Sequence, residues 1–283
     1  MLAYDLDTSN KLKKLCITGM NRWNLNNKCG VVTGGTKGIG YACASELIER
    51  GATVLICSRT DESVQSAVKS LNESSANGQA CGVVCDVSTS EGRDILQDAI
   101  HTQLNGQLDC LINNVGTNKR AKIEDSTEED YHNMMRTNID SCFFLLKHMF
   151  PLLKKSKGCV VNVASVAGIR SSGTGSIYAA TKGAMVQLTR ALACEWGGHG
   201  IRVNCVCPWM TYTPLLKEAV KNDPSQIAEA AAWTPLKRLA EPEESGATVA
   251  FLCLPASSYV TGQIISVDGG LSAQGFQGPC AKF

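Results

Sequence analysis

The chain has 283 residues, a formal net charge of +1 and 44% hydrophobic residues. This length suits one α/β domain with a sizeable core. The nearly neutral charge supplies no basic face for nucleic acid and no polybasic run for a membrane surface. No apolar stretch approaches the ~20 residues that a spanning helix needs. We therefore expect neither nucleic acid nor a membrane among the partners.

The 14 cysteines are scattered through apolar runs and include no C-x-x-C pair, which argues against a zinc ribbon and against a disulfide framework. We expect no metal site and interpret the cysteines as free core residues in a reducing compartment, the cytoplasm. Residues 1–20 lack the apolar core of a secretory signal and are expected to be a loose extension. The C-terminal Ala281-Lys282-Phe283 loosely resembles the peroxisomal S-K-L address, which makes the peroxisome the alternative.

The first expected strand, residues 29–32, leads into a glycine-rich turn and a helix that ends near Arg50. The turn has a G-x-x-x-G-x-G spacing between strand and helix. Glycines let a pyrophosphate approach the backbone, and the N–H groups at a helix N-terminus attract its charge. A tight turn without a ligand is the alternative. The cofactor hypothesis assigns contacts to Gly34, Thr36, Lys37, Gly38, Ile39 and Gly40.

The second expected strand, residues 53–57, should end beside the adenosine ribose. A carboxylate at that place is typical of NAD enzymes, but this chain has Ser58-Arg59, and Lys37 lies in the glycine turn. Two cations without an acid predict a site for the 2′-phosphate of NADP(H). Two solvated surface charges are the alternative.

A helix over residues 61–71 and a third strand over residues 80–85 are expected next. Asp86 and Val87 follow that strand and could contact the adenine, although an aspartate there also caps turns. The next helix is expected to begin at a capping box, Ser88-x-x-Glu91. The fourth strand, residues 108–112, runs into a turn in which Asn114 and Gly116 could line the adenosine.

A second capping box, Ser126-x-x-Glu129, should open a long helix that reaches about residue 155. Asn138 lies within this helix, although asparagine is a poor helix former. It could hold a water in a proton relay to Lys182. Alternatively, it marks a kink or a surface position.

The fifth strand, residues 159–163, is followed closely by Ser165, and the next helix, residues 176–196, carries Tyr178 and Lys182 one turn apart. The lysine ammonium would favour the phenolate form, so Tyr178 could exchange a proton with a carbonyl oxygen. Ser165 would hydrogen-bond the same oxygen, or it could simply cap the strand end. A tyrosine and a lysine at this spacing also occur by chance.

A sixth strand, residues 201–207, precedes an irregular apolar insert, residues 209–242, which should form a lid over the substrate pocket. A helix over residues 243–254 and a strand over residues 264–267 complete the pattern. Alternating strands and helices predict a Rossmann-type, doubly wound α/β fold with a seven-stranded parallel sheet and helices on both faces. One domain should span residues 21–275, with a tail at residues 276–283.

Together these residues resemble the short-chain dehydrogenase/reductase family in order and spacing, from about residue 22 to residue 275. The stretches Leu192-Ala193-Cys194-Glu195-Trp196 and Tyr259-Val260-Thr261-Gly262-Gln263 are most similar to its tropinone reductase-like branch. The resemblance implies a homodimer or homotetramer. It implies a catalytic set of Asn138, Ser165, Tyr178 and Lys182, with Tyr178 and Lys182 also contacting the cofactor. It further implies cofactor contacts from Pro208, Thr211 and Thr213, and a substrate contact from Trp209, where the family usually has glycine.

The resemblance also implies an activity, the NADPH-dependent reduction of a small ketone to a secondary alcohol with Tyr178 as the proton donor. The same enzyme could run in reverse as an alcohol dehydrogenase. Two other functions are a catalytically silent NADP(H)-binding regulatory protein and a 3-oxoacyl carrier-protein reductase. The complete catalytic set argues against the silent protein, which would not need it.

Overall fold

A seven-stranded parallel sheet forms the centre of the computed structural model, which describes residues 21–274. The spatial order of the strands is β3-β2-β1-β4-β5-β6-β7. The predicted doubly wound fold is thereby confirmed. The expected N-terminal extension and the C-terminal peroxisome-like residues lie outside the described part of the chain. The strands are β1 (Cys29–Thr33), β2 (Thr53–Ser58), β3 (Gln79–Val84), β4 (Cys110–Asn113), β5 (Cys159–Val163), β6 (Arg202–Pro208) and β7 (Ile264–Val267).

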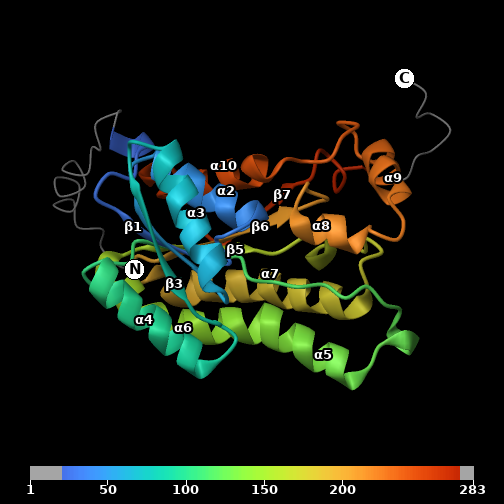
Figure 1. Cartoon of the computed structure of the whole chain (residues 1–283), viewed down its shortest axis with the longest axis horizontal. Helices are drawn as coiled ribbons and strands as arrows, with labels where there is room; N and C mark the ends of the chain where they lie inside the picture. The colour runs from blue at the N-terminus through green and yellow to red at the C-terminus, as the bar shows by residue number, and fades with distance from the viewer. Residues whose placement is uncertain (1–20, 275–283) are drawn as a thin grey trace, which may run out of the picture.

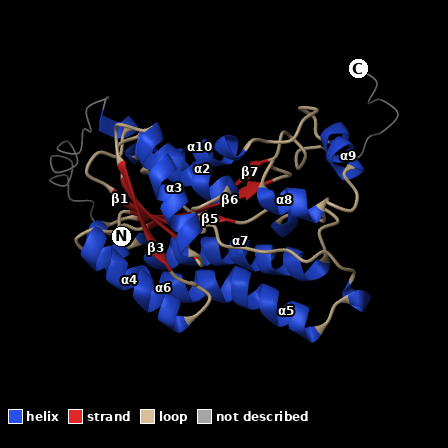
Figure 2. Ribbon diagram, in the orientation of Figure 1, coloured by secondary structure: helices blue, strands red, loops and turns tan. Residues whose placement is uncertain are grey.

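Helices cover both faces of the sheet, and the strands lie between them (Figures 1 and 2). Alternate strand residues serve two separate cores, because successive side chains point to opposite faces. Val31 belongs to the core beneath α4, α6 and α7, whereas Val32 belongs to the core beneath α2, α3 and α10. The helices are α2 (Gly38–Glu49), α3 (Asp61–Ser74), α4 (Ser90–Gln103), α6 (Ser141–Ser156), α7 (Ser176–Gly197) and α10 (Pro242–Cys253).

Two helices begin one residue later than the predicted capping boxes, so the boxes at Ser88 and Ser126 are wrong. The Oγ1 atom of Thr89 accepts a hydrogen bond from the backbone N–H of Gly92 at the start of α4. Thr127 forms a reciprocal capping box with Asp130 at the start of α5 (Glu128–Met135). Each serine is followed by a threonine that offers the same hydroxyl, and the sequence pattern does not choose between them.

The long predicted helix is interrupted once, by a π-helical turn over Arg136–Asp140 that joins α5 to α6. Asn138 lies in this turn and is fully buried. The expectation of a local irregularity is therefore confirmed, and a surface position is wrong. Such turns insert one extra residue per turn and frequently occur at functional sites.

The insert, residues 209–242, forms α8 (Pro214–Ala219) and α9 (Ser225–Trp233) and its own small apolar cluster around Leu216 and Leu239. A bridge between Thr211 and Ala240 joins its two ends. Figure 1 draws α8 and α9 beyond one end of the sheet. Within the described residues, every helix is too short or too polar to cross a membrane.

Candidate active site

A cleft of about 530 Å³ lies at the carboxyl ends of β1 to β4. At this place the strand order reverses, since β1 has β2 on one side and β4 on the other. Ligands of doubly wound sheets bind in such a crevice. The structure brings most of the predicted cofactor residues together around it. The predicted residues that line the cleft are Gly34, Thr36, Lys37, Gly38, Ile39, Gly40, Ser58, Arg59, Asp86, Val87, Asn114, Gly116 and Thr213.

The glycine turn is shaped by contacts that only glycine permits. Gly34 and Gly38 have φ angles of +63° and +54°, which favour glycine. A Cβ atom on Gly40 would lie 2.3 Å from the backbone oxygen of Gly34. The Asn114 side chain holds the turn against β4, because its Nδ2 donates to the backbone oxygens of Thr33 and Gly34 at 3.0 and 3.2 Å.

The charges around the cleft suit a phosphate. Lys37 and Arg59 are exposed and line the cleft. Lys37 is also the N-cap of α2, and no side chain caps that helix. The N–H groups of the first turn therefore remain available to an anion. Asp86 is the one acid among the lining residues, and its Oδ1 accepts from the backbone N–H of Ser88 at 2.9 Å, so the expected turn cap is present.

Tyr178 and Lys182 lie together near the start of α7. The Lys182 Nζ atom is 5.7 Å from the centre of the Tyr178 ring and donates a hydrogen bond to the Val163 backbone oxygen at 3.0 Å. Lys182 is buried, whereas Tyr178 and Ser165 are half-buried. The Ser165 Oγ atom accepts from the backbone N–H of Ala167 at 3.2 Å. The predicted strand-end cap is therefore present, and the serine hydroxyl proton is not used by it.

Asn138 connects the cleft to Lys182 through short contacts. Its Oδ1 accepts from the Thr117 backbone N–H at 2.8 Å, and its Nδ2 donates to the Thr117 oxygen and to the Thr181 Oγ1. A Cβ atom on Gly116 would lie 3.3 Å from the Lys182 Nζ and 3.5 Å from the Asn138 Oδ1. Asn138 therefore positions the segment after β4 beside the ammonium. The proton relay through Asn138 stays a prediction.

Four predicted cofactor contacts, Tyr178, Lys182, Pro208 and Thr211, are not among the described residues that line the cleft, and neither is the predicted substrate contact Trp209. The Trp209 Nε1–H donates to the Thr234 Oγ1 at 3.2 Å, and its ring packs against the apolar cluster of the insert. Thr211 is buried and donates to the Trp209 backbone oxygen. The Trp209 ring is thus held by the insert, and its contact with a substrate stays a prediction.

Sequence reasoning missed several residues of the cleft, and it missed Thr181 behind it. Most of them flank residues that were predicted, so their position along the chain was the available signal. Thr117, Thr137 and Thr181 have no motif of their own. The unpredicted lining residues are Cys57, Cys85, Ser88, Thr117, Thr137, Pro214 and Leu215.

A second, open pocket of about 840 Å³ lies beside the start of α7, between residues 120–123 and residues 167–176. Its lining includes Ala179, the neighbour of Tyr178, and Arg120. The Arg120 Nη1 donates to Gln226 on α9 at 2.6 Å, which ties the insert to this pocket. A substrate in this pocket would lie next to the helix that carries the phenol.

The comparison with known families agrees with this geometry. A short-chain dehydrogenase model described as enoyl-(acyl carrier protein) reductase matches residues 34–272. The chain belongs to the short-chain dehydrogenase/reductase family. It is therefore a nicotinamide-dependent oxidoreductase that acts on alcohol and ketone groups. A tropinone reductase homolog of Arabidopsis thaliana is 48% identical over 90% of this chain and 96% of that protein. A tropinone reductase homolog of Datura stramonium is 41% identical over 91% and 97%.

Solved structures have the same fold. A putative NAD(P)-dependent gluconate 5-dehydrogenase from Beutenbergia cavernae, with bound NADP, has a TM-score of 0.83 and 33% identity, and the match covers 89% of this chain and all of that one. Levodione reductase has a TM-score of 0.85 and 30% identity over 89% of this chain and 100% of its own. L-sorbose reductase from Gluconobacter frateurii, complexed with NADPH and L-sorbose, has a TM-score of 0.83 and 28% identity over 89% and 99%.

Proposed function

We propose that this protein reduces a small ketone to a secondary alcohol with NADPH, and that Tyr178 donates the proton. The observation that supports this most strongly is the contact around Gly116. This residue lines the cleft, and a Cβ atom placed on it would lie 3.3 Å from the Lys182 Nζ, which is 5.7 Å from the centre of the Tyr178 ring. The cofactor cleft and the Tyr178–Lys182 pair therefore both border Gly116.

The cofactor is NADP(H), and the residues present fit it. The glycine turn leaves its backbone N–H groups open, and Lys37 and Arg59 offer positive charge to a phosphate on the adenosine ribose. Lys182 is a buried ammonium with three N–H donors. The described residues give it one hydrogen-bond acceptor, the Val163 oxygen. Its remaining donors support a role in holding the ribose next to the nicotinamide. When bound, the nicotinamide supplies the hydride that the ketone carbon accepts.

The side chains of this site would manage the proton. The Tyr178 hydroxyl would give its proton to the ketone oxygen, and the Ser165 hydroxyl would donate a hydrogen bond to the same oxygen. Lys182 would hold positive charge behind the phenol, which stabilises the phenolate that remains. Asn138 would keep the Thr117 segment in place beside Lys182. A relay of solvent protons past Asn138 to Lys182 would then restore the phenol.

The substrate is proposed to be a compact, largely apolar ketone. The insert carries Leu215, Trp233 and Leu236 as exposed apolar side chains, and Leu215 also lines the cleft. Arg120 adds a polar group, since its buried Nε has no hydrogen-bond partner among the described residues. The naming of the relatives as tropinone reductase homologs supports this substrate class.

We further propose that the enzyme works in the cytoplasm as a homo-oligomer. The free cysteines of the described part suit a reducing compartment. Phe143 and Phe144 on α6 are 47% and 44% exposed, which supports subunit contacts through this helix and α7. Light scattering should find a dimer or a tetramer, and a monomer at micromolar concentration would contradict the assembly.

The activity can be tested with a panel of cyclic and aliphatic ketones, by following the oxidation of NADPH in absorbance. We expect turnover of at least one small cyclic ketone, and a secondary alcohol as the product by mass spectrometry. A carrier-protein-linked 3-oxoacyl substrate serves as the comparison. Faster turnover of that substrate than of any free ketone would assign the protein to acyl reduction. Tight NADPH binding without turnover of either class would indicate a silent protein.

A further inference from the structure

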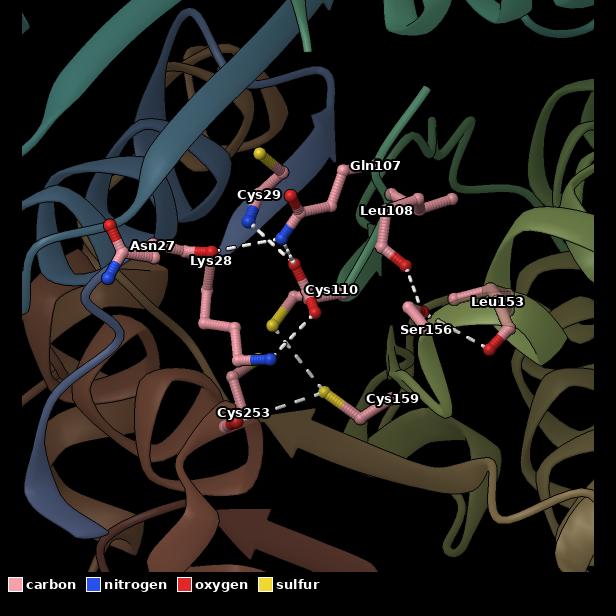
Figure 3. Close-up of polar contacts among 11 residues, drawn as sticks. Asn27, Lys28, Cys29, Gln107, Leu108, Cys110, Leu153, Ser156, Cys159 and Cys253 are labelled. Atoms are coloured by element: carbon pink, nitrogen blue, oxygen red, sulfur yellow. Dashed lines mark hydrogen bonds and ion pairs between the residues drawn. The ribbon is translucent and has the colours of Figure 1, made fainter. Parts of the chain in front are cut away.

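Three cysteines meet at the amino edge of the sheet, opposite the edge that holds the cleft. Cys110 begins β4, Cys159 begins β5 and Cys253 ends α10. Cys110 and Cys159 are paired in the sheet register, and both belong to the core beneath α10. Their Sγ atoms are 3.6 Å apart, and Figure 3 shows them facing one another. All three sulfurs lie within 4.8 Å of one another.

These sulfurs are buried and have few other partners. The three residues are 3%, 4% and 5% exposed. The hydrogen bonds of their sulfurs in the described structure run between Cys159 and Cys110 and from Cys159 to the Cys253 backbone oxygen. The thiolate is the form of cysteine that binds metals, so an ion bound here would displace the thiol protons of the cluster.

The surroundings of the cluster carry compensating charge. Lys28 lies beside it, and its Nζ forms an ion pair of 2.9 Å with Asp109, the residue before Cys110. Figure 3 shows the end of the Lys28 side chain next to the cysteines. Arg202, at the start of β6, is a second cation near Cys159. Because the Lys28 charge is paired with the Asp109 carboxylate, Arg202 is the cation that would offset a negative cluster.

The geometry points to a binding site for one soft d¹⁰ cation, with Zn²⁺ as the ion that we propose, held by the thiolates of Cys110, Cys159 and Cys253. Two sulfurs bound to one zinc at about 2.3 Å lie about 3.8 Å apart in a tetrahedral arrangement. The Cys110–Cys159 separation is already close to that value. Each Zn–S bond replaces an S–H bond, and the thiol proton passes to solvent. The bound ion would link β4 and β5 to α10, at the edge of the sheet opposite the cleft.

The test is to titrate the full-length, reduced and metal-free protein with Zn²⁺ against a chromogenic chelator. We expect one tightly bound Zn²⁺ per chain, and X-ray absorption should find three sulfur neighbours at about 2.3 Å. A Zn²⁺ concentration one hundred times the dissociation constant should raise the Tm by roughly 5–10 °C. Ketone turnover should stay the same with and without the ion.

Single cysteine-to-serine substitutions test which residues bind the zinc ion. Cys253→Ser removes one sulfur with little change in size and should abolish the tight uptake. Cys142→Ser, an equally buried cysteine in the other core, and Cys194→Ser, an exposed one, should keep it. The proposal is overturned if the reduced wild type takes up no tight Zn²⁺, if its zinc has fewer than two sulfur neighbours, or if uptake survives in a folded Cys253→Ser variant. Should that variant fail to fold, the absorption spectrum of the wild type still decides.

Discussion

The Lys182 Nζ atom lies 3.3 Å from the place where a Cβ atom on Gly116 would be. The segment after β4 therefore passes beside the ammonium of Lys182 on α7, with room for a hydrogen atom but not for a side chain. Because Gly116 lines the cleft, the proposed binding of the dinucleotide and the proposed chemistry at Tyr178 would depend on the same few residues. The predictions below separate the roles of these residues.

Replacing Tyr178 by phenylalanine should lower kcat by about 10²–10⁴-fold, because the ketone oxygen loses its proton donor. The affinity for NADPH, measured by fluorescence titration, should remain nearly unchanged. Tyr131→Phe, which alters an exposed tyrosine on α5, is the matched control and should leave kcat unaffected. Retention of most of the wild-type kcat in Tyr178→Phe would remove Tyr178 from the proton-donor role.

Lys182→Ala should weaken NADPH binding and turnover together. The substitution removes the charge beside the phenol and leaves the buried Val163 oxygen without its donor, which costs about 1–3 kcal/mol of stability. Steady-state kinetics over a range of pH would measure both effects, with the exposed Lys155→Ala as the control. Normal cofactor affinity together with an unshifted pH–rate profile would exclude Lys182 from the mechanism.

Gly116→Ala should disturb the place where Gly116 lies beside Lys182 and Asn138, without removing any polar group. The new methyl group would lie 3.3 Å from the Lys182 Nζ and 3.5 Å from the Asn138 Oδ1, so one of these side chains must shift. We expect a higher KM for NADPH and a lower kcat. Gly197→Ala, at the end of α7 with no neighbour within 4 Å, should be neutral or stabilise the fold by about 0.4–1 kcal/mol. If both variants had the kinetics of the wild type, a shift of the Lys182 or Asn138 side chain would have no effect on NADPH binding or turnover.

Arg59→Ala should reduce the preference for NADPH over NADH. Arginine can meet a phosphate with two parallel hydrogen bonds, and such charge-assisted bonds contribute about 1.5–3 kcal/mol each. Losing one should lower kcat/KM for NADPH roughly ten- to a hundredfold, while the value for NADH changes little. Lys37→Ala should have a smaller effect in the same direction. An unchanged ratio of the two cofactors in Arg59→Ala would assign the 2′-phosphate to other residues.

The start of α10 should make stability depend on acid pH. Hydrogen bonds from Arg238 and from the Glu241 backbone lower the pKa of Glu244 from 4.5 to about 2. A depressed folded pKa stabilises the protein above the unfolded value, so this contribution is lost as the pH falls from about 4.5 toward 2. The pair is partly exposed, so its value is below about 1 kcal/mol. Glu244→Gln should lower the Tm at pH 7 more than at pH 3, unlike Glu243→Gln.

Much of the fold follows from the sequence, because buried parallel strands are short apolar runs. The bounds of β5 and β7 match the prediction at both ends. The helix starts at Thr89 and Thr127 could not be chosen locally, since adjacent hydroxyls compete for the cap. Residues that are close in space but belong to no sequence motif could not be predicted as neighbours either. Thr181 is 43 residues from its partner Asn138, and Cys159 is 94 residues from Cys253.

The candidate site was predictable where a motif has a fixed local geometry, as in the glycine turn. Trp209 shows the limit of that reasoning. Its place after β6 was expected, but the direction of its ring depends on Thr234, which is 25 residues away in the insert. The orientation of a side chain at the end of a strand is set by whatever packs on it, and here that partner lies in an irregular segment.

The π-helical turn at Arg136–Asp140 has a consequence for how this region can change in related chains. The turn holds one residue more than an α-turn would and absorbs it within about one full turn, so α5 and α6 keep the facing of one continuous helix. Deleting a single residue there would restore a regular α-turn, without the rotation of about 100° that a deletion from a regular helix causes. The widened turn that holds Asn138 against Thr117 and Thr181 would be lost. Relatives that retain the activity should therefore have no single-residue deletion in this turn. Such deletions should occur there in relatives that have lost the reaction.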